Sequence, residues 1–315
     1  MSKNREEESL EEKIKSTFLR ERSDIIEFLY EDFASKGKEL NKDFLYKIEL
    51  FDLSQIDFPI PIQSFAYCGA IISKKIGGKI YKELFDFDLH SPIPVNKILY
   101  HPSNVKRYLE GITKGKNLAY DATIPYIKIS LVEEFSHAAL ASVYPQLCVS
   151  LDDPLGITTS EELKDLLAKQ TLIETIGRWH VHKYVERRGN KEDKEFEKLY
   201  ERCLDEKILL NPYLPQFQLK LLLKLFQTEY SIPIDNFTEE FESKFKNEEK
   251  KEVFRRALLY SFAENVTFLE RLISQSKDQQ KKICELGIKK PELAIKRLKK
   301  LLEFEVKSFS LYKKS

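Results

Sequence analysis

Apolar side chains recur with a helical period along much of the chain. Between residues 5 and 38 they follow one another three or four positions apart, with Glu, Lys and Arg between them, which predicts an amphipathic helix. Further helices are expected at 42–50, 104–112, 131–144 and 159–188. From residue 192 to 314 the pattern is almost continuously helical, and breaks are expected at 211–212, 231–233 and 290–291, each of which contains a proline.

The pattern changes between residues 53 and 130, where prolines interrupt any long helix. Short segments of apolar, β-branched or aromatic residues bounded by turn residues predict strands at Phe65–Ile72, Lys79–Phe87 and Tyr126–Ile129. The expected fold is therefore a helix-rich α+β protein with a small sheet. We expect three parts: a helical N-terminal arm (1–51), a central domain (52–190) and a helical C-terminal domain (191–315).

Composition narrows the class of protein. The 315 residues hold 52 Lys and Arg against 51 Asp and Glu, which excludes a strongly basic surface over the whole protein. The start of the chain lacks the apolar stretch of a signal peptide, and no apolar run approaches the roughly 18 residues of a membrane span. The four cysteines form no CxxC pair. A cytoplasmic protein with reduced cysteines is expected.

The net charge of the whole chain is close to zero, but its C-terminal segment is basic. Residues 281–315 hold 11 Lys and Arg against four Glu, on a helix that also has an apolar stripe. Such a segment is either a terminal helix that docks through its stripe, or a patch for an acidic partner, nucleic acid or a membrane surface. Aromatic residues do not alternate with the basic ones, so nucleic-acid binding by this segment is only weakly indicated. Nucleic-acid binding by the rest of the chain is not expected.

The residues with the clearest chemical potential lie in the predicted helix 131–144. Glu133 and His137 are four positions apart, so they share a helix face, and Glu134 borders that face. The surrounding sequence is so apolar that we expect the helix to be buried. Buried ionisable groups need partners or a metal ion to offset their desolvation, which makes these residues candidates for a functional site.

A second candidate helix, 171–188, contains Glu174 in an apolar turn and Gly177 three residues later. Gly177 would let another helix approach closely, because it has no side chain. His180 and His182 lie on different sides of this helix, so both cannot face one site.

Together, the Glu133–His137 run and the Glu174–Gly177 run resemble the active-site region of gluzincin-type zinc metallopeptidases, which have an HExxH helix and a glutamate ligand on a later helix. The resemblance covers about 70 residues, 116–187, and Glu133 stands where the family has its first histidine. It implies a zincin-like central domain and an edge strand ending at Ser130. It also implies that Glu133, His137 and Glu174 are metal ligands and that Glu134 is the catalytic base of a peptidase or other hydrolase acting on a peptide or protein.

The ligand set implied by this resemblance is unusual. A carboxylate can replace an imidazole as a zinc ligand. Two carboxylates and one histidine form a harder set than two histidines and one carboxylate, so Mn or Fe would suit the site as well as Zn.

Three alternatives remain open on the sequence. The chain would be a pseudoenzyme if a zincin-derived domain had kept its fold as a binding or scaffold module without catalysis. Glu134 and His137 also form an ExxH motif, as in ferritin-like di-iron carboxylate proteins, but a clear second ExxH is missing. Finally, the same residues would form ordinary buried Glu–Arg or His–Glu pairs in a structural core.

Overall fold

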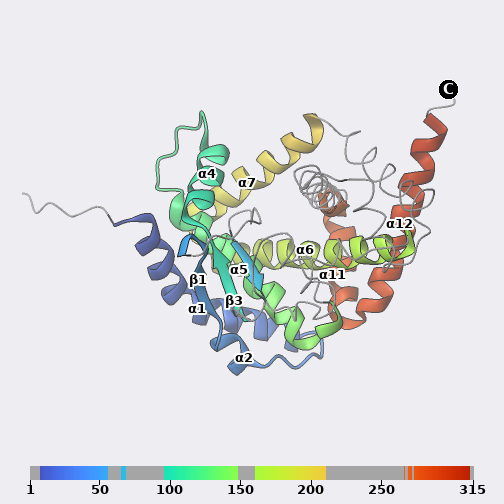
Figure 1. The fold of residues 1–315 in the computed structure, drawn as a ribbon, viewed down its shortest axis with the longest axis horizontal. Coiled ribbons are helices and arrows are strands. Elements are labelled where there is room, and N and C mark those ends of the chain that lie inside the picture. The colour runs from blue at the N-terminus through green and yellow to red at the C-terminus, as the bar shows by residue number, and fades with distance from the viewer. Residues whose placement is uncertain are drawn as a thin grey trace, which may run out of the picture. The chain divides into compact units, whose positions relative to one another are not determined.

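A computed structural model describes residues 8–55, 65–68, 96–147, 160–210, 266, 269–271 and 273–312 (Figure 1). The chain divides into two compact units. The first comprises Met1–Gly69, Pro94–Pro145 and Gly177–Cys203, and the second comprises Ala70–Ile93, Gln146–Ile176 and Leu204–Ser315. The three-part division expected from the sequence stays a prediction.

The first unit begins with helix α1 (Leu10–Ala34), as the hydrophobic period predicts. Ser9 caps it: the Ser9 hydroxyl accepts a hydrogen bond from the Glu12 amide, and the Glu12 carboxylate accepts one from the Ser9 amide. This reciprocal pair satisfies two N–H groups that lack a partner inside the helix. The apolar stripe of α1 packs against a later helix, α5 (Thr123–Val143). A short helix, α2 (Lys42–Tyr46), follows.

A small mixed sheet also belongs to the first unit. Its strands are β1 (Glu49–Asp52), β2 (Phe65–Cys68) and β3 (Lys97–Tyr100). The central strand β3 pairs in parallel with β1 and antiparallel with β2, so that Leu99 lies opposite Phe51 and Ala66. The strand predicted at Phe65–Ile72 is confirmed for its first four residues, and the rest of it and the strand predicted at Lys79–Phe87 lie outside the described residues.

The strand expected at Tyr126–Ile129 is wrong. These residues belong to helix α5 (Thr123–Val143), which contains residues 131–143 of the expected helix 131–144 and extends it by two turns toward the N-terminus. Residues 125–136 are all buried, with α1 and β2 among the elements that cover them. A helix that is covered on all sides shows no amphipathic period, so its first turns read as a β-like apolar run. The edge strand that the gluzincin resemblance implies before Glu133 is therefore helix.

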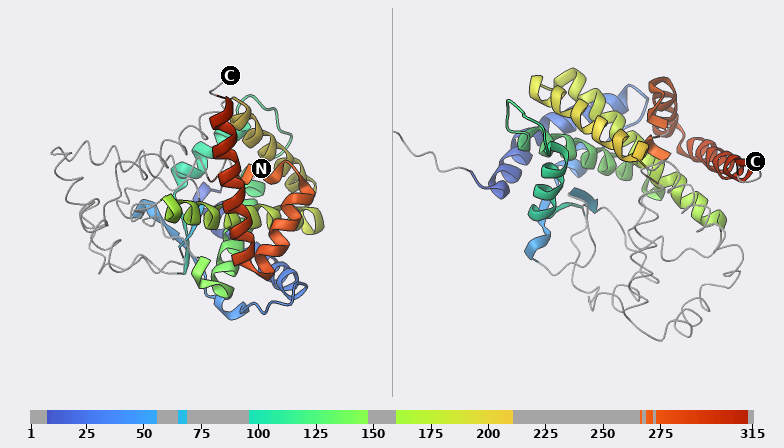
Figure 2. Two further views of the ribbon diagram at one scale, coloured as in Figure 1. Left: turned by 90° about the vertical axis from the view of Figure 1, so that its right-hand side faces the viewer. Right: turned by 90° about the horizontal axis from the view of Figure 1, so that it is seen from above.

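The other elements among the described residues up to 210 are helical. They are a single turn at Leu53–Gln55, α4 (Pro102–Thr113), a single turn at Pro145–Leu147, α6 (Ser160–Arg188) and α7 (Lys191–Leu210). Two further views show α6 as one uninterrupted helix (Figure 2). It continues from the second unit into the first, because the division falls between Ile176 and Gly177.

The described part of the second unit contains α11 (Lys277–Lys289) and α12 (Pro291–Tyr312). The predicted break at 290–291 is confirmed, and the other two predicted breaks lie outside the described residues. Gly287 of α11 packs so closely on α6 that a Cβ atom built there would lie 2.7 Å from Leu172. In the basic segment, Lys299 of α12 pairs with Glu161 at 2.5 Å. The helix-rich α+β class is thus confirmed, while the zincin-like domain stays a prediction.

Candidate metal centre

Helix α5 carries three polar residues of the candidate site in a buried setting. Glu133, Glu134 and His137 lie on consecutive turns, and their side chains are 11%, 10% and 14% exposed. The helix is held there by the packing of its apolar residues. Two carboxylates in so enclosed a place are costly unless a cation or hydrogen-bond donors face them.

Helix α6 approaches α5 at Gly177, as the sequence predicts. A Cβ atom built on Gly177 would lie 2.7 Å from Nε2 of His137 and 3.3 Å from Cγ of Glu133. Any side chain at position 177 would therefore push the His137 ring aside. The glycine brings the backbone of α6 against the very residues that the sequence singles out.

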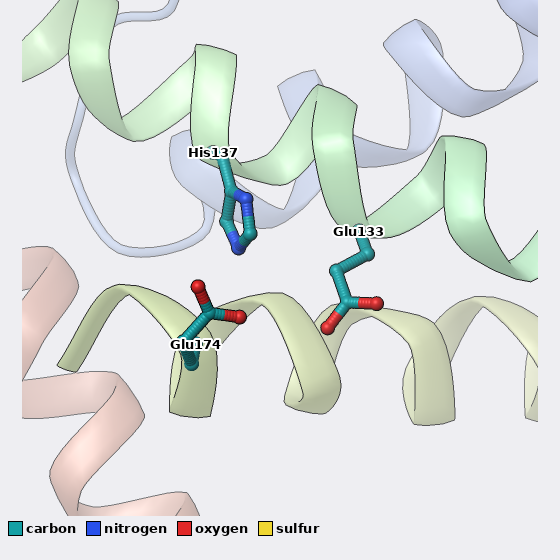
Figure 3. Close-up of side chains that lie close together, drawn as sticks. All are labelled: Glu133, His137 and Glu174. Carbon is teal, nitrogen blue, oxygen red and sulfur yellow. The ribbon is translucent and has the colours of Figure 1, made fainter. Parts of the chain in front are cut away.

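Glu174 lies one helical turn before Gly177. Because α6 is uninterrupted, the close approach at Gly177 also places Glu174 beside α5. Glu133, His137 and Glu174 each offer one ligand atom, and these atoms all lie within 4.8 Å of one another. Figure 3 shows the two side chains of α5 and the one of α6 converging on the space between the helices. It is the one group of potential ligands of this kind among the residues that the structure describes.

This geometry is compatible with a single bound ion. Ligand atoms around a tetrahedral ion at about 2.1 Å lie about 3.4 Å apart. Movements of about 1 Å in the side chains would therefore place the three ligand atoms around one ion. The donors are two carboxylate oxygens and one imidazole nitrogen, which suit Zn, Mn or Fe. The residues therefore fit a divalent metal ion.

Glu134 contacts His137 rather than pointing at the shared space. Its Oε2 lies 3.2 Å from Nδ1 of His137. With Nδ1 donating to this carboxylate, Nε2 is the nitrogen with a lone pair, and Nε2 is the atom that faces Gly177. A carboxylate on the second ring nitrogen is the common support for a metal-binding histidine, since it fixes the tautomer and the ring orientation.

Two residues that the sequence interpretation did not assign to the site complete its surroundings. Arg178 places Nε 3.2 Å from Oε1 of Glu133, and its Nη2 donates to the Tyr200 hydroxyl at 2.6 Å. Burial, aided by the nearby charge of Glu133, raises the pKa of Tyr200 to about 12, against the influence of Arg178. Arg178 could have been found from its position four residues after Glu174, whereas no sequence pattern indicates Tyr200, which comes from α7.

Glu174, the candidate ligand on α6, also has a polar neighbour. Gln170 donates a hydrogen bond from Nε2 to Oε1 of Glu174 at 2.6 Å. The two residues are four positions apart on one helix face, which is the spacing at which helical side chains meet. The contact restrains the Glu174 carboxylate.

A second polar network crosses the same two helices and was missed in the sequence. The Ser136 hydroxyl lies 2.6 Å from Nδ1 of His180, and Nε2 of His180 lies 3.0 Å from Oδ2 of Asp32. A serine, a histidine and an aspartate in series have the connectivity of a nucleophilic triad. Here Ser136 and His180 are 0% exposed and Asp32 is 2% exposed, so a substrate has no access to the hydroxyl. We interpret the series as structural.

Electrostatics support that interpretation. Burial alone would raise the pKa of Asp32, but hydrogen bonds from His180, Lys183 and Lys36 hold it far below its ordinary value. Burial lowers the pKa of His180, against the opposing pull of Asp32. His180 is therefore neutral, donates a hydrogen bond from Nε2 to Asp32 and accepts one at Nδ1 from the Ser136 hydroxyl. Phe28 and Phe33 of α1 pack against the ring.

The remaining histidine of α6 lies outside the site. His182 is 35% exposed and places Nδ1 2.9 Å from Oε1 of Glu197 on α7. As the sequence indicates, His180 and His182 do not face a common point: one is buried in the network with Asp32, and the other is paired at the surface.

Comparison with known proteins gives no match to a family model, to a curated protein or to a solved structure. Among the described residues, no helix combines the length and the apolar character needed to cross a membrane.

Proposed function

We propose that this chain binds one divalent metal ion through Glu133, His137 and Glu174. The observation that carries the proposal is the convergence of three ligand atoms within 4.8 Å from two helices that meet at a glycine. Two further features support it: Gly177 lets the two helices come close enough for the ligand atoms to converge, and a carboxylate on Nδ1 orients the His137 ring.

We further propose that the protein with its metal ion bound is a metal-dependent hydrolase of the peptidase type. The metal would supply a water molecule of lowered pKa and a polarised carbonyl. The gluzincin resemblance assigns to Glu134 the role of taking the proton from that water. To do so, its carboxylate would turn away from Nδ1 of His137, which it contacts at 3.2 Å. A peptide or protein substrate is an expectation from the gluzincin resemblance.

The first experiment measures metal binding directly. The purified full chain, freed of metal by chelation and then dialysed against Zn²⁺, Mn²⁺ or Co²⁺, should retain about one equivalent of metal. His137→Ala and Glu174→Gln should each lower the affinity at least 100-fold, because each removes one of only three ligands. His182→Ala is the matched control, since it removes a histidine of α6 that lies outside the site. A wild-type protein that holds no stoichiometric metal overturns the proposal.

A second pair of variants separates the two roles open to Glu134. Glu134→Gln can still accept a hydrogen bond from His137 but cannot take a proton, whereas Glu134→Ala can do neither. For a catalytic base, Glu134→Gln should abolish peptide hydrolysis and leave metal affinity nearly unchanged. If Glu134 only orients His137, Glu134→Ala should lower metal affinity about 10- to 100-fold, and Glu134→Gln should keep whatever hydrolysis the wild type shows.

A further inference from the structure

One permanent cation is held against a proposed metal ligand. The Arg178 guanidinium pairs with Glu133 through Nε, donates to the Tyr200 hydroxyl through Nη2, and places its central carbon 4.4 Å from the centre of the Tyr200 ring. The Arg178 and Glu133 side chains are only 12% and 11% exposed. Water therefore screens this ion pair poorly, and Tyr200 restrains the guanidinium from moving away.

This arrangement has two opposite consequences for a bound ion. The guanidinium orients the Glu133 carboxylate, which favours binding of any cation. At the same time its own positive charge repels the ion, and that repulsion grows in proportion to the charge of the ion. Orientation affects all metals alike, whereas repulsion penalises a trivalent ion more than a divalent one.

We propose that Arg178 makes the Glu133–His137–Glu174 site selective for divalent over trivalent cations. The inference rests on the proposed metal site and adds the residue that determines its charge preference. Three glutamates, Glu133, Glu134 and Glu174, surround one histidine there. An oxygen-rich site of such charge would by itself favour trivalent ions, and Arg178 offsets one of its negative charges.

The size of the effect follows from Coulomb's law. At a separation of about 6–8 Å and an effective dielectric constant of about 20, one unit of charge changes an equilibrium about 30- to 100-fold. Removing the Arg178 charge should therefore raise the ratio of trivalent to divalent affinity by about that factor. A purely structural role for Arg178 would leave this ratio unchanged, whatever happened to stability.

The experiment compares Tb³⁺, followed by its luminescence, with Mn²⁺ in competition on the full-length protein. Arg178→Gln should raise the Tb³⁺/Mn²⁺ affinity ratio about 30- to 100-fold. Arg178→Lys, which keeps the charge but loses the planar fork, should stay within about threefold of the wild-type ratio. Arg187→Gln is the matched control: it removes the same charge from an exposed position on α6, about 13 Å farther along the helix.

The outcomes separate this inference from the proposed function. A wild-type protein that binds neither ion overturns both. A wild-type protein that binds Mn²⁺, with an unchanged ratio in Arg178→Gln, overturns only the role of Arg178. If Arg178→Gln does not fold, as judged by circular dichroism, Arg178→Met takes its place, because it also removes the charge: a ratio raised about 30- to 100-fold supports the charge effect, and a ratio near that of the wild type contradicts it.

Discussion

Two polar clusters cross the same pair of helices, α5 and α6, and differ in how they are completed. Ser136, His180 and Asp32 are almost fully buried and bond to one another in series. The second cluster contains two carboxylates and one imidazole, those of Glu133, Glu174 and His137, and it is slightly more exposed to solvent. Its ligand atoms converge on one space without forming such a series. The first cluster links its three members to one another, while the second brings together three ligand atoms that could hold a metal ion.

The contrast begins at adjacent residues. Ser136 and His137 are consecutive on α5, so their side chains point about 100° apart around the helix. One direction leads to α1 and Asp32, and the other leads to Gly177 and Glu174. A histidine next to a carboxylate is therefore not by itself a sign of chemistry, because its burial and its remaining bonds decide the role.

The largest expected effect comes from breaking the buried cluster. Asp32→Ala leaves Lys36, Lys183 and His180 without their shared carboxylate, and should lower the free energy of unfolding by about 3–5 kcal/mol in urea denaturation. Glu31→Ala is the control on the same helix, because its pair with Arg188 is exposed and should be worth less than about 1 kcal/mol. A loss below 1 kcal/mol for Asp32→Ala would refute a structural role for this cluster.

A smaller effect, confined to the other cluster, is expected from Gly177→Ala. The added methyl group would meet Nε2 of His137, so metal affinity measured by equilibrium dialysis should fall at least tenfold although all three ligands remain. Gly111→Ala in α4, where a Cβ meets nothing within 4 Å, should leave metal affinity unchanged. Equal affinities in the two variants would show that the close approach does not shape the site.

The smallest effect is a pH dependence of stability that originates in the buried cluster. Burial lowers the pKa of His180 from its ordinary value of 6.5. Below pH 6.5 the imidazole of residue 180 is therefore protonated in the unfolded chain while it stays neutral in the folded chain. The free energy of unfolding contributed by this group is thus complete above pH 6.5 and falls on acidification, by at most about 1.4 kcal/mol per pH unit.

The depressed pKa of Asp32 adds to this loss only below its ordinary value of 3.8. Thermal melting between pH 7.5 and 5 should therefore show a decline that is weaker in His180→Gln, whose amide does not titrate. The same decline in both proteins would assign the pH dependence to other groups.

Two of the three candidate ligands could be predicted from local spacing, whereas Glu174 was implied by the gluzincin resemblance. Glu133 and His137 share a helix face because they are four residues apart, and a glycine within a predicted helix, such as Gly177, indicates that another helix can approach closely there. Asp32 and His180, by contrast, are 148 residues apart, and only the packing of α1 against α5 and α6 brings them together. No local pattern carries that information.

Local pattern also failed where burial was complete. Tyr126–Ile129 looks like a strand, yet it forms the start of α5, because a helix covered on every side needs no polar face. The sequence by itself determined which residues could act as ligands, since residue type and helical spacing are local properties. Only the tertiary structure decided that Glu174 meets them, that Arg178 faces Glu133 and that Ser136 is sealed, because these depend on which helices pack together and how closely.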